Sequence, residues 1–131
     1  MKKITASFAG KTLLVADDYV VNQELTKEML EMMDCEVDIA EDGKEAFDMY
    51  NENSYDLIFM DVQMPEMDGY ETTRKIRDIE GKDKHIPIVA ITANALTGDK
   101  EKCIESGMDD YISKPIKGEI LEEMLTRYLS S

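Results

Sequence analysis

Short apolar runs alternate with longer amphipathic stretches along the chain. The short runs hold four to six residues, and most are rich in Val, Ile, Leu and Phe, which is typical of β-strands. The stretches between them repeat apolar residues every three or four positions, which is typical of helices that pack one face on a core. We therefore expect five strands, at residues 12–16, 35–40, 56–60, 87–91 and 110–113.

A helix is expected in each stretch between these strands and after the last one, with its apolar residues facing the core. Several of the ten methionines fall on these faces, which favours core packing over a methionine-rich binding surface. Those methionines are Met29, Met32, Met49 and Met124. The predicted apolar faces are formed by Val21, Leu25, Met29 and Met32; by Ala46, Phe47 and Tyr50; by Ile76 and Ile79; by Leu96, Cys103 and Ile104; and by Ile120, Leu121, Met124, Leu125 and Tyr128.

The strands predicted at 12–16, 56–60 and 87–91 are almost continuously apolar, as expected for parallel strands covered by helices on both faces. A strand–helix unit repeated five times, with short right-handed crossovers, predicts an α/β fold with a doubly wound parallel sheet. The most economical strand order is 2-1-3-4-5, the flavodoxin-like (βα)5 arrangement. Turn-forming residues fall near the predicted helix ends or turns. They are Asp42-Gly43, Asp68-Gly69, Gly81, Gly98 and Gly107.

Composition narrows the class of protein. The 131 residues suffice for one domain with a single core. The formal net charge of −14 disfavours direct contact with nucleic acid or an anionic membrane and favours protein or cation partners. Cys35 and Cys103 fit neither a CxxC motif nor zinc-ligand spacing, and one histidine, His85, cannot form a histidine-based metal site. Because no signal peptide or membrane-spanning run appears, we expect a cytoplasmic protein with reduced thiols.

Polar residues follow four of the five predicted strands. Asp17 and Asp18 follow the first strand, Asp61 the third, Thr92 the fourth and Lys114 the fifth. Each has an ordinary structural explanation, such as helix capping or a solvated surface position. In a doubly wound sheet, however, ligands bind beyond the carboxyl ends of the strands, where the winding reverses between strands 1 and 3. Three carboxylates, a hydroxyl and an ammonium at one edge therefore predict a site.

The charges of this group indicate its chemistry. Two carboxylates about 4 Å apart repel by roughly 4 kcal/mol at an effective dielectric constant near 20, so the group needs a cation. All-oxygen ligands favour Mg²⁺, with Mn²⁺ as a substitute. Asp61 stands alone after the central strand and is the best candidate for a nucleophile that accepts a phosphoryl group. Lys114 would then supply positive charge and Thr92 a hydrogen bond.

Two rival functions of this edge are less well supported. An aspartate-nucleophile phosphatase of the haloacid-dehalogenase type needs a DxDx(T/V) motif, and Asp61-Val62-Gln63 lacks the second acid. Flavin or dinucleotide binding is weaker still, because no GxGxxG motif or P-loop follows a strand.

Four stretches give the chain a family resemblance. LLVADD, DLIFMDVQMPEMDGYE, PIVAITANAL and GMDDYISKPI, read in this order and spacing, resemble the receiver domains of two-component response regulators. MDVQMPEMDG is highly specific, and the second half is most similar to receivers attached to hybrid sensor kinases. The resemblance runs from about Lys11 to the last helix, which implies an N-terminal extension at 1–10 and a receiver domain at 11–131.

The resemblance assigns metal and phosphate roles residue by residue. It implies that Asp61 is the phosphorylation site, that Asp18 binds Mg²⁺ directly and Asp17 through water, and that Gln63 offers its backbone carbonyl. Tyr19 departs from the family, which often has Asn or a small polar residue there. Either its ring alters access to the acidic pocket, or it lies on the surface of the first helix with little effect.

The resemblance also implies a switch. Thr92 and Lys114 match the phosphate-sensing hydroxyl and the lysine of the family, Tyr111 matches its aromatic switch position, and the Lys114–Pro115 bond is expected in cis. We expect a phosphohistidine on a histidine kinase or histidine phosphotransfer domain to donate to Asp61. The face formed by the fourth and fifth helices and the fifth strand would then change shape.

This reading implies a signalling switch rather than an enzyme with a separate substrate, although the domain would assist its own phosphotransfer and dephosphorylation. We expect a monomer, with phosphorylation-dependent dimerisation as the alternative. A receiver-like module that docks constitutively and never carries phosphate stays open as a rival. The sequence also leaves open whether this is a free-standing regulator or a receiver from a hybrid kinase.

Overall fold

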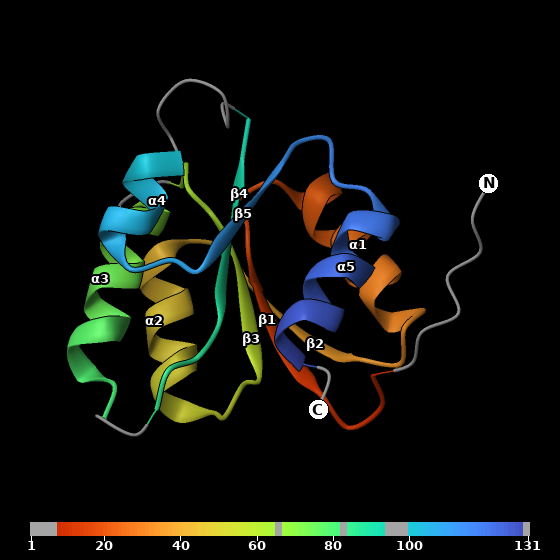
Figure 1. Ribbon diagram of the computed structural model, residues 1–131, viewed down its shortest axis with the longest axis horizontal. Coiled ribbons are helices and arrows are strands. Elements are labelled where there is room, and N and C mark those ends of the chain that lie inside the picture. The colour runs from red at the N-terminus through yellow and green to blue at the C-terminus, as the bar shows by residue number, and fades with distance from the viewer. Residues whose placement is uncertain (1–7, 65–66, 82–83, 94–99, 130–131) are drawn as a thin grey trace.

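The computed structural model describes residues 8–64, 67–81, 84–93 and 100–129. In these residues five strands alternate with five helices (Figure 1). All strand pairs are parallel, and the sheet order is β2-β1-β3-β4-β5, which confirms the predicted topology. The elements are β1 (Thr12–Ala16), α1 (Val20–Glu31), β2 (Glu36–Ala40), α2 (Gly43–Glu52), β3 (Leu57–Asp61), α3 (Gly69–Ile79), β4 (Ile88–Thr92), α4 (Lys100–Ser106), β5 (Asp110–Ser113) and α5 (Gly118–Leu129).

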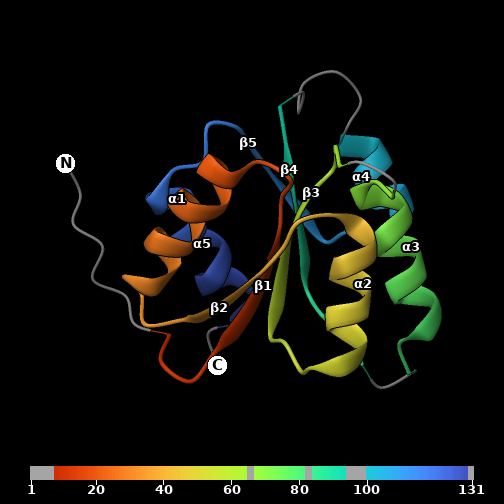
Figure 2. The same cartoon turned by 180° about the vertical axis from the view of Figure 1, so that it is seen from behind.

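The helices form two layers around the sheet. Helices α1 and α5 cover one face, and α2, α3 and α4 cover the other (Figures 1 and 2). Because successive residues of a strand point to opposite faces, each central strand contributes to both cores. In β3, for example, Leu57 and Phe59 pack under α1 and α5, while Ile58 and Met60 pack on the opposite side. The central strands are therefore buried on both faces, as their continuous apolar runs predicted.

Strands β3 and β4 each lie one residue later than predicted. Pro87 has no N–H, so the regular ladder of β4 begins at Ile88, although the Pro87 carbonyl still accepts the Ile58 N–H at 2.9 Å. At the other end the pairing continues, with Asp61 beside Ile91. Asp61 and Thr92 are consequently the last residues of their strands rather than the first residues of the following loops.

The prediction for α1 was wrong, because this helix buries a different face. Val21, Leu25 and Met32 are 56%, 45% and 64% exposed. The buried face includes polar side chains that hydrophobic periodicity does not count, and the Gln23 side-chain amide donates to the Asp17 carbonyl at 2.6 Å. A buried polar group is stable when it is hydrogen-bonded in this way. The buried residues of α1 are Gln23, Thr26 and Leu30.

Other predicted faces are only partly confirmed. Ile79, Ile104 and Ile120 are exposed, while their neighbours on the same helices, including Ile76, Cys103 and Leu121, are buried. Each of these apolar stripes is wider than the surface that its helix buries. Met124 is buried, and Met29 and Met49 are half-buried. Leu96 and Gly98 lie outside the described residues.

The starts of α2 and α3 depend on short side chains. Asp42 and Asp68 cap these helices by accepting the N–H groups of Glu45 and Glu71. Gly69, the first residue of α3, lies so close to the end of β3 that a Cβ there would be 2.3 Å from the Asp61 carbonyl oxygen. The glycine therefore allows α3 to begin directly beside the predicted acceptor.

The chain before β1 packs on the domain. Phe8 is half-buried against the core under α1 and α5, and its N–H donates to the Met33 carbonyl at 2.8 Å. The boundary between an extension and the receiver domain at residue 11 stays a prediction. Among the described residues, no helix is both long enough and apolar enough to cross a bilayer.

Candidate functional site

Three carboxylates from the ends of β1 and β3 form the centre of the predicted site. Strand β1 pairs with β3 up to Ala16 and Met60, so the next residues, Asp17 and Asp61, follow neighbouring strand positions. Asp17, Asp18 and Asp61 each offer a carboxylate oxygen, and these oxygens lie within 4.8 Å of one another. Asp17 and Asp61 are buried, while Asp18 is exposed. The topology has thus brought Asp61 next to Asp17 and Asp18, which lie 44 and 43 residues before it in the sequence.

Asp17 has a buried oxygen that is suited to a cation. Its Oδ1 accepts the Tyr19 N–H at 2.9 Å, whereas its Oδ2 is buried and accepts no hydrogen bond from the described residues. Burial raises the pKa of Asp17, and the charges of Asp61 and Asp18 raise it further, against the lowering effects of the Tyr19 N–H and Lys114. An unpaired buried carboxylate oxygen beside two further acids fits a hard divalent cation such as Mg²⁺.

Asp61 is held by one cationic and one backbone donor. Lys114 Nζ lies 3.0 Å from Asp61 Oδ2, and the Gln63 N–H donates to Asp61 Oδ1 at 3.0 Å. Lys114 reaches across from the end of β5, where its N–H donates to the Thr92 carbonyl at 2.9 Å. The Asp61 side chain is only 2% exposed, so this ion pair is partly removed from water and is screened less than a surface pair.

The remaining predicted residues surround this centre. Thr92 is buried at the end of β4, next to β3 in the sheet. Tyr111 lies on β5, half-buried, and its ring centroid is 5.8 Å from Lys100 Nζ. The Lys114–Pro115 bond is cis, as the resemblance implied. Tyr19 occupies the N-cap position of α1 without a side-chain capping hydrogen bond and is 58% exposed, so its ring lies on the surface.

A cleft of about 560 Å³ opens beside the acids. Asp18 and Gln63 line it together with Tyr70 from α3 and Lys102 from α4. Neither Tyr70 nor Lys102 follows a predicted strand, so neither was expected at the site. Their positions depend on how α3 and α4 pack on each other and on the sheet, and the only sequence signal is that Tyr70 lies within the matching stretch DGYE.

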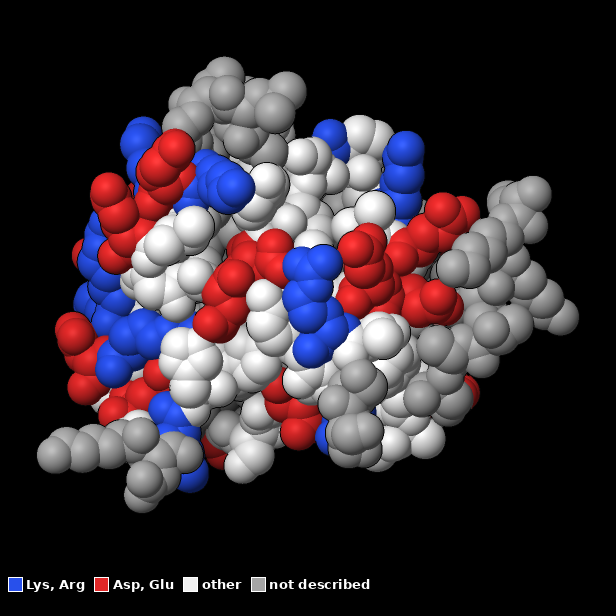
Figure 3. All heavy atoms as spheres, viewed as in Figure 1, with Lys and Arg blue, Asp and Glu red and all other residues white. Residues whose placement is uncertain are grey.

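Charge of both signs is spread over one face of the molecule. Figure 3 shows lysine and arginine interspersed with aspartate and glutamate over the face that carries α3, α4 and α5. The three clustered carboxylates of the site are therefore distinguished by their proximity and burial rather than by the overall acidity of the chain.

The chain has clear relatives among known proteins. The chain matches the response regulator receiver domain family over residues 13–126, and it therefore belongs to that family. It is 48% identical over 119 residues to hybrid signal transduction histidine kinase I of Dictyostelium discoideum, a match that covers 86% of this chain. It is 37% identical to the sensor histidine kinase RcsC of Escherichia coli K12, covering 88% of this chain. The chain spans 7% and 12% of the length of these two relatives.

Solved structures agree with the fold. The receiver domain of sensor histidine kinase PA1611 from Pseudomonas aeruginosa is 40% identical, with a TM-score of 0.86 over 94% of this chain and 100% of that chain. That structure holds a magnesium ion in its active-site cleft. A receiver domain of Ssk1 from Saccharomyces cerevisiae, solved with the histidine phosphotransfer protein Ypd1, is 30% identical with a TM-score of 0.85, over 96% of this chain and 91% of that chain. The chain is a receiver domain of the type used in phosphorelay signalling.

Proposed function

We propose that Asp61 accepts a phosphoryl group from a phosphohistidine, at a site that binds Mg²⁺ or, in its place, Mn²⁺. One observation carries this proposal: three carboxylate oxygens lie within 4.8 Å of one another, and Lys114 Nζ contacts one of these carboxylates, that of Asp61, at 3.0 Å. The cation would be held by Asp17, Asp18, Asp61 and the Gln63 backbone carbonyl. When bound, it supplies positive charge that offsets the carboxylates and the incoming phosphoryl oxygens.

Asp61 acts as the nucleophile. One of its carboxylate oxygens forms a bond to phosphorus as the bond from phosphorus to one histidine ring nitrogen breaks. The electron pair of the broken bond stays on that nitrogen, and because the other ring nitrogen of the phosphohistidine carries a proton, the imidazole leaves neutral. Lys114 stabilises the negative charge on the transferred oxygens, because its ammonium already lies against Asp61. Burial of Asp61 keeps bulk water from the reacting atoms. The later attack of water on the acyl phosphate uses the same charges, so the domain assists its own dephosphorylation.

Thr92 and Tyr111 change their positions in response to the new negative charge. Thr92 ends β4 one residue after Ile91, which pairs with Asp61, so its hydroxyl can turn toward a phosphoryl oxygen and donate to it. Tyr111 lies on the adjacent strand with its ring against Lys100 of α4. A shift of Thr92 makes room for the Tyr111 ring, and the face formed by α4, β5 and α5 changes shape.

A histidine kinase or a histidine phosphotransfer domain is the proposed donor. The kinship with receivers of hybrid kinases supports this choice. So does an exposed apolar group next to the acids, formed by Tyr19, Val20, Val21 and Leu25 at the start of α1, which suits a protein partner better than nucleic acid.

We place the domain in the cytoplasm, as a monomer. Its buried cysteines are free, and burial raises the pKa of the Cys35 thiol to about 11, as expected of an unreactive reduced thiol.

Treatment with acetyl phosphate and Mg²⁺ tests the acceptor. The wild-type protein is expected to gain one phosphoryl group by intact mass, and Asp61→Asn none. Beryllofluoride with Mg²⁺ is expected to change the amide spectrum of the wild type only. Uptake by Asp61→Asn would refute the assignment of Asp61. If the wild type shows neither uptake nor a Mg²⁺-dependent spectral change, the domain is a constitutive docking module instead.

A further inference from the structure

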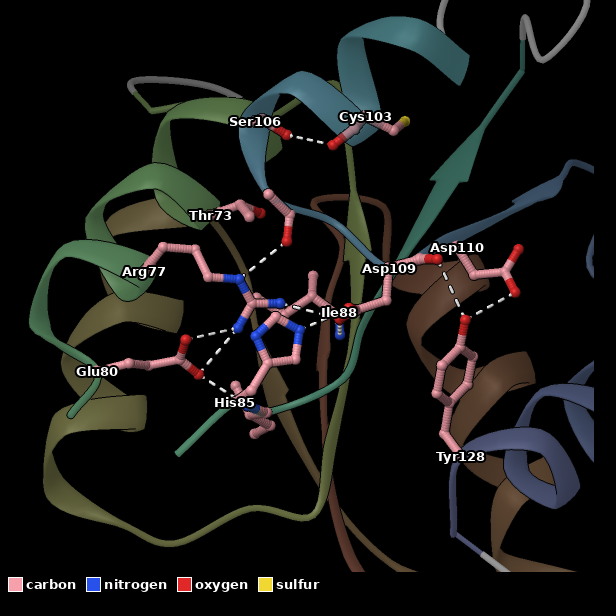
Figure 4. Close-up of polar contacts among 12 residues, drawn as sticks. Thr73, Arg77, Glu80, His85, Ile88, Cys103, Ser106, Asp109, Asp110 and Tyr128 are labelled. Carbon is pink, nitrogen blue, oxygen red and sulfur yellow. Dashed lines mark hydrogen bonds and ion pairs between the residues drawn. The ribbon is translucent and has the colours of Figure 1, made fainter. Parts of the chain in front are cut away.

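A second polar cluster lies where β4 and β5 begin, at the opposite ends of these strands from Thr92 and Lys114. It joins the end of α3, the loop before β4 and the turn between α4 and β5 (Figure 4). We call it the Arg77 cluster and define it as Arg77, Glu80, His85, Gly107 and Asp109. The phosphoryl transfer proposed above uses none of these residues.

Arg77 lies at the centre of the cluster, with its side chain only 16% exposed. Its Nε donates to the Gly107 carbonyl at 2.8 Å. Nη1 donates to both carboxylate oxygens of Glu80 at 2.8 Å, and Nη2 donates to Asp109 Oδ2 at 2.9 Å. One planar guanidinium thus connects α3 to the turn between α4 and β5, which a lysine with its single ammonium could not do in this geometry.

The two carboxylates extend the cluster to the backbone of β4. Asp109 Oδ2 also accepts the Ile88 N–H at 2.9 Å, and Glu80 Oε2 accepts the Ile86 N–H at 2.7 Å. Asp109 Oδ1 lies 2.6 Å from His85 Nε2, and the Asp109 N–H donates to the Ile88 carbonyl at 2.9 Å. The start of β4 is therefore held against the start of β5 by both backbone and side chains.

Helix α5 contacts the start of β5 from the other face of the sheet. The Tyr128 hydroxyl lies 3.1 Å from the Asp109 carbonyl oxygen and 2.9 Å from Asp110 Oδ2 (Figure 4). Arg127 pairs with the same Asp110 carboxylate. The beginning of β5 is thus fixed between α3 and α5, whereas its end carries Lys114 in the phosphorylation site.

The two ends of α4 differ in how they are held. At its C-terminal end Gly107 has a φ of +105°, and Arg77 packs over it so closely that a Cβ there would be 2.9 Å from Arg77 Cγ. At the first turn Lys100 is exposed and lies over the Tyr111 ring, 5.8 Å from its centroid. A cation–π contact at an exposed site is weaker than a set of partly buried, charge-assisted hydrogen bonds.

We propose that Arg77 is a positioning residue for the switch, and that the Gly107 turn is the pivot about which α4 moves when Asp61 is phosphorylated. The first turn of α4 is displaced while the start of β5 stays in place. This inference rests on the proposed function, because it describes where the response to phosphorylation is confined.

The physical reason is the cost of separating the charges of the cluster. Moving the Gly107 turn away from α3 would leave Arg77, Glu80 and Asp109 partly buried without their partners, which is strongly unfavourable. Lys100–Lys102 are exposed, and among the described residues their displacement breaks the contact of Lys100 with the Tyr111 ring at the surface. Phosphorylation therefore displaces the first turn of α4, whose displacement costs less free energy. This turn is also the end of the helix next to Tyr111.

Amide hydrogen exchange of the wild-type protein in Mg²⁺, with and without beryllofluoride, tests the pivot directly. Amides of Ile104 and Glu105, whose helical acceptors are Lys100 and Glu101 in the first turn of α4, are expected to change their exchange rates by about tenfold or more, and those of Gly107–Asp110 by less than about twofold. Asp61→Asn serves as the control without a response. A change at Gly107–Asp110 as large as that at Ile104 and Glu105 would overturn the pivot alone. No response anywhere would overturn the proposed function and the pivot with it.

Removing the guanidinium gives the second test. In Arg77→Met the beryllofluoride response is expected to spread to Gly107–Asp110, with changes of about tenfold there. Arg74→Met, on the exposed side of the same helix, is the matched control and should keep the wild-type distribution. If Arg77→Met does not fold, the isosteric Asp109→Asn tests the same contact with the same expectation. A folded variant that is merely less stable, with the wild-type distribution of responses, would show that Arg77 has no positioning role.

Discussion

At the scale of single residues, the burial of Asp17 has the clearest consequence. Burial, and then the charges of Asp61 and Asp18, raise its pKa above the ordinary value of 3.8, although the Tyr19 N–H and Lys114 oppose the shift. Between its ordinary pKa and its higher folded-state pKa, Asp17 is therefore protonated to a greater extent in the folded protein than in the unfolded chain. The contribution of Asp17 to stability falls as the pH rises through its folded-state pKa, and ionised Asp17 weakens the cation-free fold at neutral pH.

We predict that Asp17→Asn raises the melting temperature in EDTA at pH 7 by about 4 °C, the shift expected from about 1 kcal/mol in a domain of this size. Because a cation ligand is lost, the same variant should gain little stability from Mg²⁺. Scanning calorimetry measures both effects. Asp48→Asn, an exposed change on α2 with the same loss of charge, is the control. Equal melting temperatures for the two variants in EDTA would contradict the account of Asp17.

Lys114 carries the other residue-scale prediction. Lys114→Met leaves the buried Asp61 carboxylate without its ammonium partner. We expect the free energy of unfolding to fall by about 1–3 kcal/mol. We also expect phosphorylation by acetyl phosphate to slow by about tenfold or more, since charge stabilisation of the transferred group is lost. Lys117→Met, three residues further on and exposed, should change neither quantity. Denaturant unfolding and the rate of phosphoryl uptake provide the measurements.

At the scale of elements, the strands could be predicted from sequence more completely than the helices. Strands β1, β3 and β4 are buried on both faces, so apolarity alone predicts them, and polar residues at their ends marked the site. Helix α1 could not be oriented in the same way. Hydrogen bonding decides which side of α1 is inside, because the Gln23 amide binds the Asp17 carbonyl, and a count of apolar residues does not include that contact.

Two identical substitutions test the orientation of α1. Leu30 is fully buried, so Leu30→Ala should lower the free energy of unfolding by about 2–5 kcal/mol. Leu25 belongs to the predicted apolar face but is 45% exposed, so Leu25→Ala should cost less than about 1 kcal/mol. Urea denaturation of both variants measures the difference. A larger cost for Leu25→Ala than for Leu30→Ala would mean that the periodic face is the buried one after all.

The Arg77 cluster shows a second limit at this scale. Arg77 donates to the carbonyl of Gly107, 30 positions away in the sequence, and to the carboxylate of Asp109, 32 positions away. No local pattern signals such a contact, because it exists only once α3, β4 and β5 have packed together. The positions of Tyr70 and Lys102 in the cleft depend on packing for the same reason.

At the scale of the whole molecule, the effect of the net charge of −14 on stability must be distinguished from the effect of a cation bound at the site. Any salt screens the repulsion among surface carboxylates and raises stability modestly. We predict that MgCl₂ raises the melting temperature more than NaCl does at equal ionic strength. The excess should disappear in the Asp17→Asn/Asp18→Asn double variant, while the effect of NaCl persists. An excess that survives in the double variant would assign it to diffuse charge instead.

The fold as a whole followed from the alternation of strands and helices, and the sheet order is the one predicted. Asp17, Asp18, Asp61 and Lys114 lie together because parallel strands bring their carboxyl ends to one edge. Their chemistry could be argued from charge alone as far as a cation and a phosphoryl acceptor. The partner could not be predicted in the same way. The chain spans only 7–14% of the length of the histidine kinases that it matches.

The central claim is that Asp61 becomes an acyl phosphate, and trapping that group tests it most directly. The protein is incubated with acetyl phosphate and Mg²⁺, reduced with borohydride, which converts an aspartyl phosphate to homoserine, and analysed by peptide mass spectrometry. We predict homoserine at position 61, and none in EDTA or in Asp61→Asn. Homoserine at Asp17 or Asp18 instead, or phosphorylated protein without homoserine at position 61, would contradict the account.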